Sequence, residues 1–338
     1  MDWIDTDSNM KHIYVRHQDE AREQQMIKIV EVGPRDGLQN ETAPLPKDVK
    51  IAFVDALSDT GVAEIEVSAF VSPRWVPQLA DAEAVFYGIT RKEGVTYSAL
   101  VPNENGLDRA LAARVDKIAV FAAASETFSL KNINASIGES IERFKPVTKR
   151  ARSEGLPVRG YVSTAFWCGF EGKIEPEAAV DVVARLADIG VDEVSISDTI
   201  GKASSDEVKR LLDLLLPAYP KERVAMHFHD TYGRGVENVL TSFSYGIHIF
   251  DSSVGGLGGC PYAPGAAGNV ATEDVACALE AVGEPVSTDR VKLSRARRLL
   301  DPYLVNDRRS LPKDGSPMCA SCQFSTGEVC CKRHEMRS

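Results

Sequence analysis

The chain has 338 residues, of which 43% are hydrophobic and 26% are charged, the usual balance of a soluble globular protein with a large core. Its 39 lysines and arginines against 49 aspartates and glutamates leave a net charge of −10. This charge argues against a nucleic-acid or anionic-membrane partner, and no apolar run approaches the roughly 18 residues that span a bilayer.

The first residues carry no recognisable targeting pattern. Residues 1–26 form a polar arm with several acidic side chains, unlike a secretory signal or an acid-poor transit peptide. The seven cysteines are an odd number, which argues against a disulfide framework in the absence of an export signal. We therefore expect a cytoplasmic protein.

From residue 27 onward, a short β-branched run followed by an amphipathic stretch recurs along the chain. The predicted strands are residues 27–32, 64–68, 96–101, 117–121, 158–163, 193–197, 224–228 and 248–252. The predicted helices are residues 47–59, 80–89, 106–113, 137–153, 177–189, 206–216, 235–244 and 273–282. Glycines just past helix ends and a cap at Ser205-Asp206 support these boundaries; the glycines are Gly61, Gly155, Gly190 and Gly246.

Eight strand–helix units in about 250 residues have the size and rhythm of a (β/α)8 TIM barrel. The alternative, a doubly wound open sheet, usually carries a glycine-rich phosphate turn after its first strand, and residues 33–37 are not that turn. We therefore predict an α/β barrel domain over residues 27–312, which includes an extra basic helix at 291–300. A short cysteine-rich C-terminal extension follows at 313–338.

Two histidines at the seventh predicted strand give the sharpest local signal. Side chains alternate along a strand, so His227 and His229 point the same way, toward the axis near the C-terminal mouth of a barrel. Two imidazoles at this spacing can ligate one divalent metal ion. The alternative is a pair of hydrogen-bonded core histidines.

Three acidic residues and one arginine are expected at the same mouth. Arg35 and Asp36 follow the first strand, where the carboxylate can join the imidazoles as a metal ligand and the guanidinium can stabilise an enolate oxygen. Glu66 lies in the second strand and Asp198 ends the sixth, and either can orient a metal ligand or the arginine. Each of these residues can equally belong to a structural ion pair.

A glycine-rich loop after the eighth strand carries a thiol. Four glycines in residues 255–259 give a backbone that can close over a site, and Cys260 follows them. A cysteine has an ordinary pKa of about 8.5, within reach of acid–base chemistry at neutral pH. Asn269 precedes the last helix, where it is either a further metal ligand or a helix cap.

Several long motifs in this order resemble one known family. Residues 31–41, 68–78, 131–134, 227–233 and 255–274 are closely similar to the motifs of 3-hydroxy-3-methylglutaryl-CoA lyases, and the likeness runs from about residue 27 to 285. The resemblance implies a TIM-barrel lyase that uses Mg²⁺ or Mn²⁺ to cleave 3-hydroxy-3-methylglutaryl-CoA into acetoacetate and acetyl-CoA. Leucine breakdown is the pathway that it implies.

The resemblance also implies a role for each candidate residue. Asp36, His227, His229 and Asn269 match the metal ligands of the family, and Arg35 matches the residue that stabilises the enolate. Cys260 matches the catalytic thiol, while Glu66 and Asp198 match acidic positions of the active site. In our hypothesis, Asp36 or His227 takes the proton of the substrate hydroxyl and Cys260 helps to deliver one to the enolate.

Two departures and one unfamiliar segment qualify this resemblance. The family run Cys-Pro-Tyr-Glu-Gly is replaced at residues 168–172 by Cys-Gly-Phe-Glu-Gly with Trp167 before it, and a lysine of some members is Thr42. The first change bears on which acyl group is accepted, and the second removes one positive contact to an anionic substrate. The tail holds four cysteines that fit a redox-sensitive or disordered segment better than a zinc site: Cys319, Cys322, Cys330 and Cys331.

Three alternatives stay open at this point. The first is a lyase for a longer 3-hydroxy-3-alkylglutaryl-CoA, and the second is a related Claisen synthase that condenses acetyl-CoA with a 2-oxo acid. The third is a non-catalytic scaffold, which the joint presence of the candidate residues argues against. The expected partner is a CoA thioester, with no nucleic acid and no membrane, and the pattern leaves a homodimer open.

Overall fold

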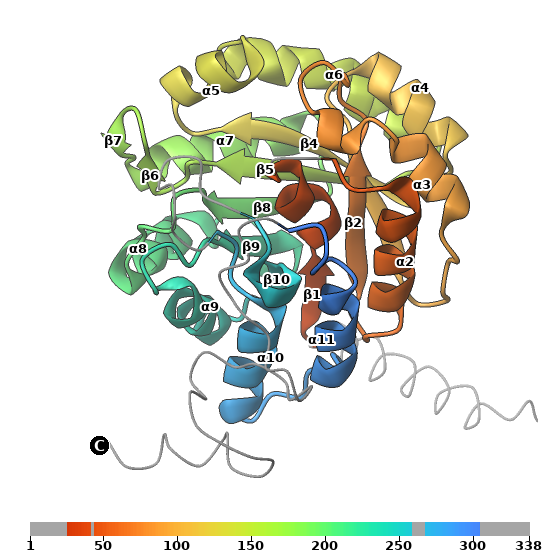
Figure 1. Ribbon diagram of the computed structural model, residues 1–338. Helices are drawn as coiled ribbons and strands as arrows, with labels where there is room; N and C mark the ends of the chain where they lie inside the picture. The colour runs from red at the N-terminus through yellow and green to blue at the C-terminus, as the bar shows by residue number, and fades with distance from the viewer. Residues whose placement is uncertain (1–25, 42–43, 259–267, 305–338) are drawn as a thin grey trace, which may run out of the picture.

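Eight parallel strands close into a barrel in the computed structural model, which describes residues 26–41, 44–258 and 268–304. Around the barrel the order is β1, β10, β9, β8, β5, β4, β3, β2 (Figure 1). The strands are β1 (Lys28–Glu31), β2 (Glu64–Ala69), β3 (Thr96–Leu100), β4 (Lys117–Ala123), β5 (Val158–Ser163), β8 (Glu193–Asp198), β9 (Val224–Phe228) and β10 (Ile249–Ser252). The predicted (β/α)8 barrel is therefore confirmed.

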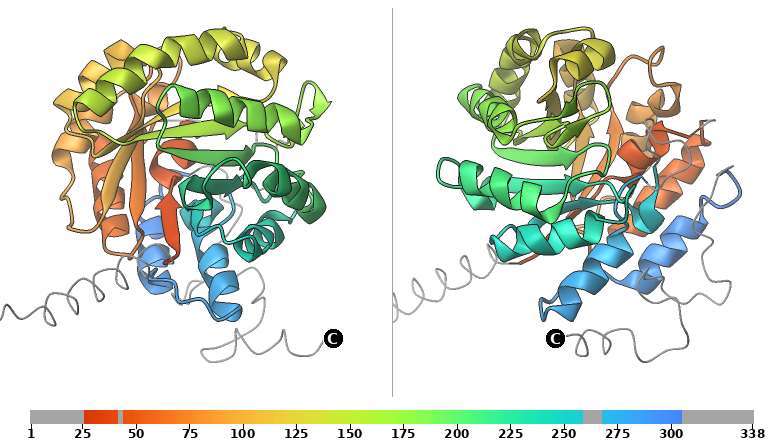
Figure 2. Two further views of the ribbon diagram at one scale, coloured as in Figure 1. Left: turned by 180° about the vertical axis from the view of Figure 1, so that it is seen from behind. Right: turned by 90° about the vertical axis from the view of Figure 1, so that its left-hand side faces the viewer.

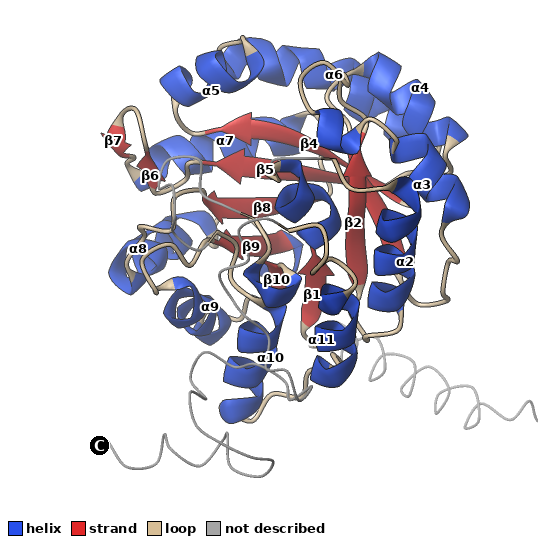
Figure 3. Ribbon diagram, viewed as in Figure 1, coloured by secondary structure: helices blue, strands red, loops and turns tan. Residues whose placement is uncertain are grey.

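Helices surround the barrel on its outer side, as the views from behind and from the side show (Figure 2), and as the colouring by secondary structure makes plain from the front (Figure 3). They are α2 (Lys47–Ser58), α3 (Ala82–Gly88), α4 (Glu104–Ala112), α5 (Glu126–Ile133), α6 (Ile137–Ser153), α7 (Pro176–Asp188), α8 (Ser205–Leu215), α9 (Gly235–Ser244), α10 (Thr272–Ala281) and α11 (Arg290–Arg298). In the described part of the chain, every helix is too short or too polar to span a lipid bilayer.

Local signals fixed most element boundaries. Gly61, Gly155, Gly190 and Gly246 all adopt positive φ where helices end, as their positions predict. The cap of α8 is a correction: the side chain of Ser204, rather than Ser205 or Asp206, accepts a hydrogen bond from the amide of Glu207. Glu207 accepts in return from the amide of Ser204, so the two residues form a capping box.

The elements that were not predicted include three that follow barrel strands. A π-helical turn (Gly33–Gly37) follows β1, the short helix α5 follows β4, and a hairpin of β6 (Trp167–Cys168) and β7 (Gly172–Lys173) follows β5. Glu171 in the hairpin accepts a hydrogen bond from the amide of Thr127 in α5, and Trp167 donates to Glu207 in α8. The hairpin therefore joins two helices at the same end of the barrel.

The inside of the barrel is largely ionic below the mouth. Lys117 lies 2.9 Å from Glu64 and 2.8 Å from Glu193, and Arg159 lies 3.0 Å from Glu193 and 2.6 Å from Asp251. Buried charges are stable only when they are paired, so this chain of contacts fixes how the inward-facing side chains are arranged. Its upper end, Asp251, reaches the histidine pair.

Candidate active site

A cavity of about 370 Å³ opens at the C-terminal mouth of the barrel. One wall is polar and includes Arg35, Asp36, His227 and His229, which come from the ends of β1 and β9. A second part of the lining, called here the apolar wall, comes from β3, β4, α5 and the segment after β2. It includes Leu100, Phe121, Phe128 and Val76, together with Trp75 and the polar Asn132. Catalytic groups in such barrels lie at this end of the strands.

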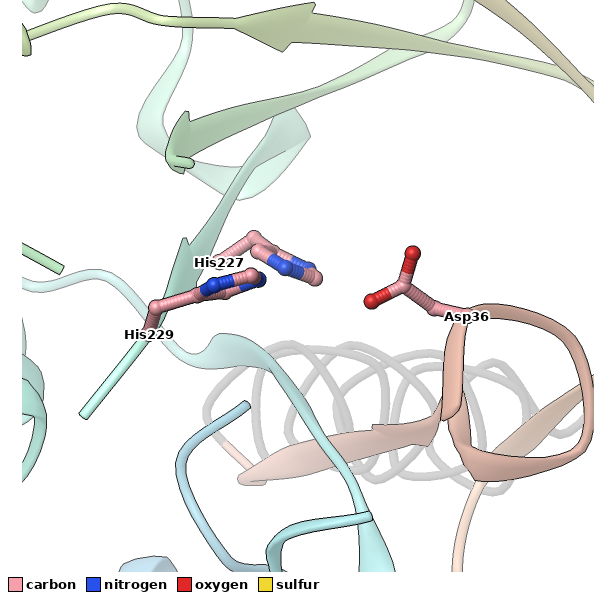
Figure 4. Close-up of side chains that lie close together, drawn as sticks. All are labelled: Asp36, His227 and His229. Atoms are coloured by element: carbon pink, nitrogen blue, oxygen red, sulfur yellow. The ribbon is translucent and has the colours of Figure 1, made fainter. Parts of the chain in front are cut away.

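Asp36, His227 and His229 come together on the polar wall. Each offers a ligand atom, and these atoms all lie within 4.8 Å of one another. The two imidazole rings are 5.4 Å apart and face the carboxylate from the opposite side, as Figure 4 shows. Alternation along β9 places both histidines inward, as predicted, and a β-bridge to Asn269 holds the backbone of His229 just beyond the strand.

The π-helical turn after β1 explains how Arg35 and Asp36 reach the cavity. The amides of Asp36 and Gly37 both donate to the carbonyl of Val32, at 2.7 and 3.3 Å. A side chain at Gly33 would place its Cβ 2.6 Å from the Glu31 carboxylate, so any larger residue there would have to displace that buried group. Turns of this kind occur often at functional sites.

Arg35 is held by two carboxylates. Its Nε and Nη2 atoms both lie 2.6 Å from Oε2 of Glu66, and its Nη1 atom donates to Oδ1 of Asp36 at 2.8 Å. The guanidinium also lies over the ring of Tyr161, 5.3 Å from its centroid. Glu66 thus positions the arginine, one of the alternatives expected from the sequence, and the arginine itself lines the cavity.

Asn269 belongs to the same group of side chains. Its amide nitrogen donates to Oδ2 of Asp36 at 2.8 Å and to the carbonyl of Leu257 at 3.0 Å. It does not cap the helix that follows it, because the N-cap of α10 is Ala271. Asn269 Oδ1 and His229 Nδ1 are both buried without a hydrogen-bond partner among the described residues.

Asp36, His227, His229 and Asn269 together fit a divalent metal ion. A buried polar atom without a partner is costly, and both unpartnered atoms belong to side chains grouped around the Asp36 carboxylate. Imidazole nitrogens, a carboxylate and an amide oxygen are ligands that bind Mg²⁺ or Mn²⁺. An ion among them would satisfy groups that the protein alone leaves unpaired.

Electrostatics keep the group ready to bind a cation. Burial opposes ionisation of Asp36, but the Arg35 guanidinium and the two imidazoles lower its pKa below the ordinary value. Burial, followed by the neighbouring His227, lowers the pKa of His229 to about 4. At neutral pH the site therefore holds an ionised carboxylate and a neutral imidazole, the forms in which both can ligate a metal.

Asp198 does not line the cavity. Ser195 and Ser197 of β8 face the barrel interior, so alternation turns Asp198 outward, in register with the outward-facing Phe228. Its carboxylate accepts hydrogen bonds from the amides of Lys202 and Ala203. Burial raises the pKa of Asp198 to about 6, although the two hydrogen bonds act in the opposite direction and lower it. The expectation that its carboxylate reaches the mouth is wrong, and its catalytic role stays a prediction.

The comparisons with known proteins agree on one family. The family model described as HMGL-like matches residues 26–300, which is most of the chain. The chain belongs to the HMGL-like family. The resemblance seen in the sequence motifs is thereby confirmed.

Individual members of the HMGL-like family are similar to this chain over most of their length. A rat protein named 3-hydroxy-3-methylglutaryl-CoA lyase, cytoplasmic, is 50% identical over 270 residues, 80% of this chain and 79% of the rat protein. A Pseudomonas aeruginosa 3-hydroxy-3-isohexenylglutaryl-CoA/hydroxy-methylglutaryl-CoA lyase is 51% identical over 249 residues, 74% and 83% of the two chains. The crystal structure of the HMG-CoA lyase from Brucella melitensis matches with a TM-score of 0.82 at 47% identity, covering 83% of this chain and 100% of that one.

Sequence reasoning missed three interior residues of this HMGL-like barrel. Asp251 lies 3.3 Å from the Nδ1 atom of His227, Arg159 pairs with Asp251, and Tyr161 lines the cavity between the two arginines. The available signal was alternation: Arg159 and Tyr161 share the inward face of β5, and a lone acid stands among apolar residues of β10. Strand register, which the sequence does not give, decides that they meet.

Other predictions concern residues outside the described part of the chain. These are Cys260, which is predicted to be the catalytic thiol, Thr42 and the cysteines of the tail. The altered run at residues 168–172 forms the β6–β7 hairpin, where buried Cys168 accepts hydrogen bonds from Ser125 and from the amide of Phe170. In this HMGL-like chain, that cysteine thus has a structural role.

Proposed function

We propose that the chain is a hydroxymethylglutaryl-CoA lyase that cleaves 3-hydroxy-3-methylglutaryl-CoA to acetoacetate and acetyl-CoA. The observation that carries the proposal is the meeting of Arg35, Asp36, His227 and His229 at one wall of the cavity. The names of the rat, Pseudomonas and Brucella proteins support the same reaction. They favour a lyase over the Claisen synthase and the non-catalytic scaffold that the sequence had left open.

The reaction needs one proton removed and one proton returned. The hydroxyl at C3 of the substrate loses its proton, the C2–C3 bond breaks, and its electron pair becomes the enolate of the CoA thioester. A proton at C2 then gives acetyl-CoA, while C3 becomes the ketone of acetoacetate. The step is balanced without an oxidant or a reductant, so acid–base and electrostatic groups suffice.

Each polar side chain suits one part of this reaction. A divalent ion held by Asp36, His227, His229 and Asn269 would lower the pKa of the substrate hydroxyl and orient the substrate. Asp36 or His227 takes the hydroxyl proton, and the Arg35 guanidinium, fixed by Glu66, faces the oxygen of the developing enolate. We propose Cys260 as a group that returns a proton, and Mg²⁺ or Mn²⁺ as the ion.

A coupled assay tests the proposal. Purified full-length protein should release acetyl-CoA from 3-hydroxy-3-methylglutaryl-CoA, lose that activity with EDTA, and recover it with Mg²⁺ or Mn²⁺. His229→Ala should lose most of the activity and bind Mn²⁺ more weakly. The control is His248→Ala, whose ring faces the carbonyl of Gly246 away from the cavity wall. No release by the metal-loaded wild type would contradict the proposal.

A second substrate is favoured by the apolar wall of the cavity. Leu100, Phe121, Phe128 and Val76 offer hydrocarbon surface beside the polar groups, and the Pseudomonas relative is named for both a methyl and an isohexenyl substrate. We propose that a longer 3-alkyl chain is accepted on this wall. Comparing kcat/KM for the methyl and isohexenyl thioesters tests this, and undetectable cleavage of the isohexenyl thioester would exclude it.

Two further expectations accompany the proposed function. The cytoplasmic placement expected from the sequence agrees with the name of the rat relative. A homodimer stays a prediction, and sedimentation of the purified full-length chain would test it.

A further inference from the structure

Asp251 is buried inside the barrel beside the histidine pair. Its side chain has no exposed surface, and the register places it directly opposite His227 on the neighbouring strand. Parallel strands in register turn such residues to the same face, so both side chains point inward. Asp251 lies outside the four residues proposed to hold the metal ion.

Three groups contact the Asp251 carboxylate. Arg159 donates to Oδ1 at 2.6 Å, Ser195 donates to Oδ2 at 2.7 Å, and the Nδ1 atom of His227 lies 3.3 Å from Oδ2. Arginine is always charged, and its contact with a buried carboxylate keeps that carboxylate ionised. Every hydrogen bond to Asp251 must therefore be donated by its neighbour.

This requirement fixes the tautomer of His227. An ionised carboxylate can only accept, so the Nδ1 atom that faces it carries the ring proton. In a neutral imidazole the other nitrogen, Nε2, then keeps a free lone pair. His229 differs, because its Nδ1 atom has no hydrogen-bond partner among the described residues.

We propose that Asp251 is a positioning residue that holds the proton of His227 on Nδ1 and thereby keeps the single lone pair on Nε2 free to bind the metal ion. The proposal rests on the proposed function, because the value of a free Nε2 depends on the metal site. Carboxylates that orient a metal-binding histidine typically change metal affinity by about 10- to 100-fold when they are replaced.

A matched pair of variants tests the proposal. Asp251→Asn removes the obligatory acceptor beside His227. Glu193→Gln removes the other carboxylate on Arg159, which lies 3.0 Å from its Nε atom and is not bonded to His227. Both variants disturb the buried ion pairs, so both should lower the melting temperature. Only Asp251→Asn should change the tautomer and the metal affinity.

Two measurements on the full-length chain provide the readout. Nitrogen-15 spectra of the metal-free protein with labelled histidines, assigned with His227→Gln, report the tautomer of His227. Wild type and Glu193→Gln should show the proton on Nδ1, and Asp251→Asn should show a mixture or the Nε2-protonated form. Calorimetric titration with Mn²⁺ should show about 10- to 100-fold weaker binding for Asp251→Asn and wild-type binding for Glu193→Gln.

The proposal is overturned by a wild-type His227 protonated on Nε2, or by an Asp251→Asn protein with wild-type tautomer and Mn²⁺ affinity. If Asp251→Asn does not fold, the wild-type spectrum alone decides, because a His227 ring protonated on Nε2 would overturn the proposal and one protonated on Nδ1 would support it. Failure of the wild type to cleave the thioester contradicts the proposed function instead, and leaves the tautomer result intact.

Discussion

Replacing Lys117 by methionine should destabilise the protein strongly. Lys117 is buried in the barrel, and its ammonium lies 2.9 Å from Glu64 and 2.8 Å from Glu193. Glu193 would keep its contact with Arg159, but Glu64 would lose its ion-pair partner. Removing one partner of a buried pair costs about 3–5 kcal/mol. At about 2 °C per kcal/mol for a chain of this size, the melting temperature should fall by roughly 6–10 °C.

Scanning calorimetry of the full-length protein at pH 7 measures this loss. Lys209→Met is the matched control, because Lys209 pairs with Asp206 on the exposed surface of α8 and should leave the melting temperature unchanged. The double variant Lys117→Met/Glu64→Gln should recover part of the loss, since it removes the unpaired carboxylate. The reasoning is refuted if Lys117→Met has the same melting temperature as the wild type, or if the double variant has a lower melting temperature than Lys117→Met.

Three more outcomes are expected. Gly61→Ala should lower the melting temperature more than Gly94→Ala. Both glycines have positive φ, but only at Gly61 would the added Cβ clash with backbone, 2.1 Å from the carbonyl oxygen of Ser287. Equal shifts in melting temperature would contradict this. Burial raises the pKa of Glu31 to about 8, so the folded state keeps a proton that the unfolded state releases near its ordinary pKa. Stability should fall on the order of 3 kcal/mol from pH 5 to 8, and Glu31→Gln should flatten this slope in denaturant titrations. Arg35→Lys should lower kcat about 100-fold, whereas Mn²⁺ should still bind in calorimetric titration because the four proposed ligands are kept; an unchanged kcat would contradict the role of the guanidinium.

The barrel was predictable because its signals are local. Buried strands are short β-branched runs, and glycines end the helices at positive φ, so both patterns can be recognised without tertiary information. The π-helical turn after β1 and the hairpin after β5 were not predictable in the same way. The hairpin strands are two residues long, and the turn packs against β2, which comes from elsewhere in the fold.

The candidate site was predictable where one strand carries the signal. His227 and His229 share a face by alternation, and the same rule, applied to β8, would have turned Asp198 away from the cavity. Asp251 could not be found in this way. Its role depends on which residue of β9 lies opposite it, and strand register is decided by the packing of the whole barrel.

The two walls of the cavity come from different parts of the chain. The polar groups stand on the ends of β1 and β9, whereas the hydrocarbon surface is built by β3, β4, α5 and the segment after β2. Substitutions on the hydrocarbon side can therefore widen or narrow the space for an alkyl chain while the bond-breaking groups keep their geometry. Gene duplicates of such a protein can diverge in the molecules they select and still inherit the same chemistry.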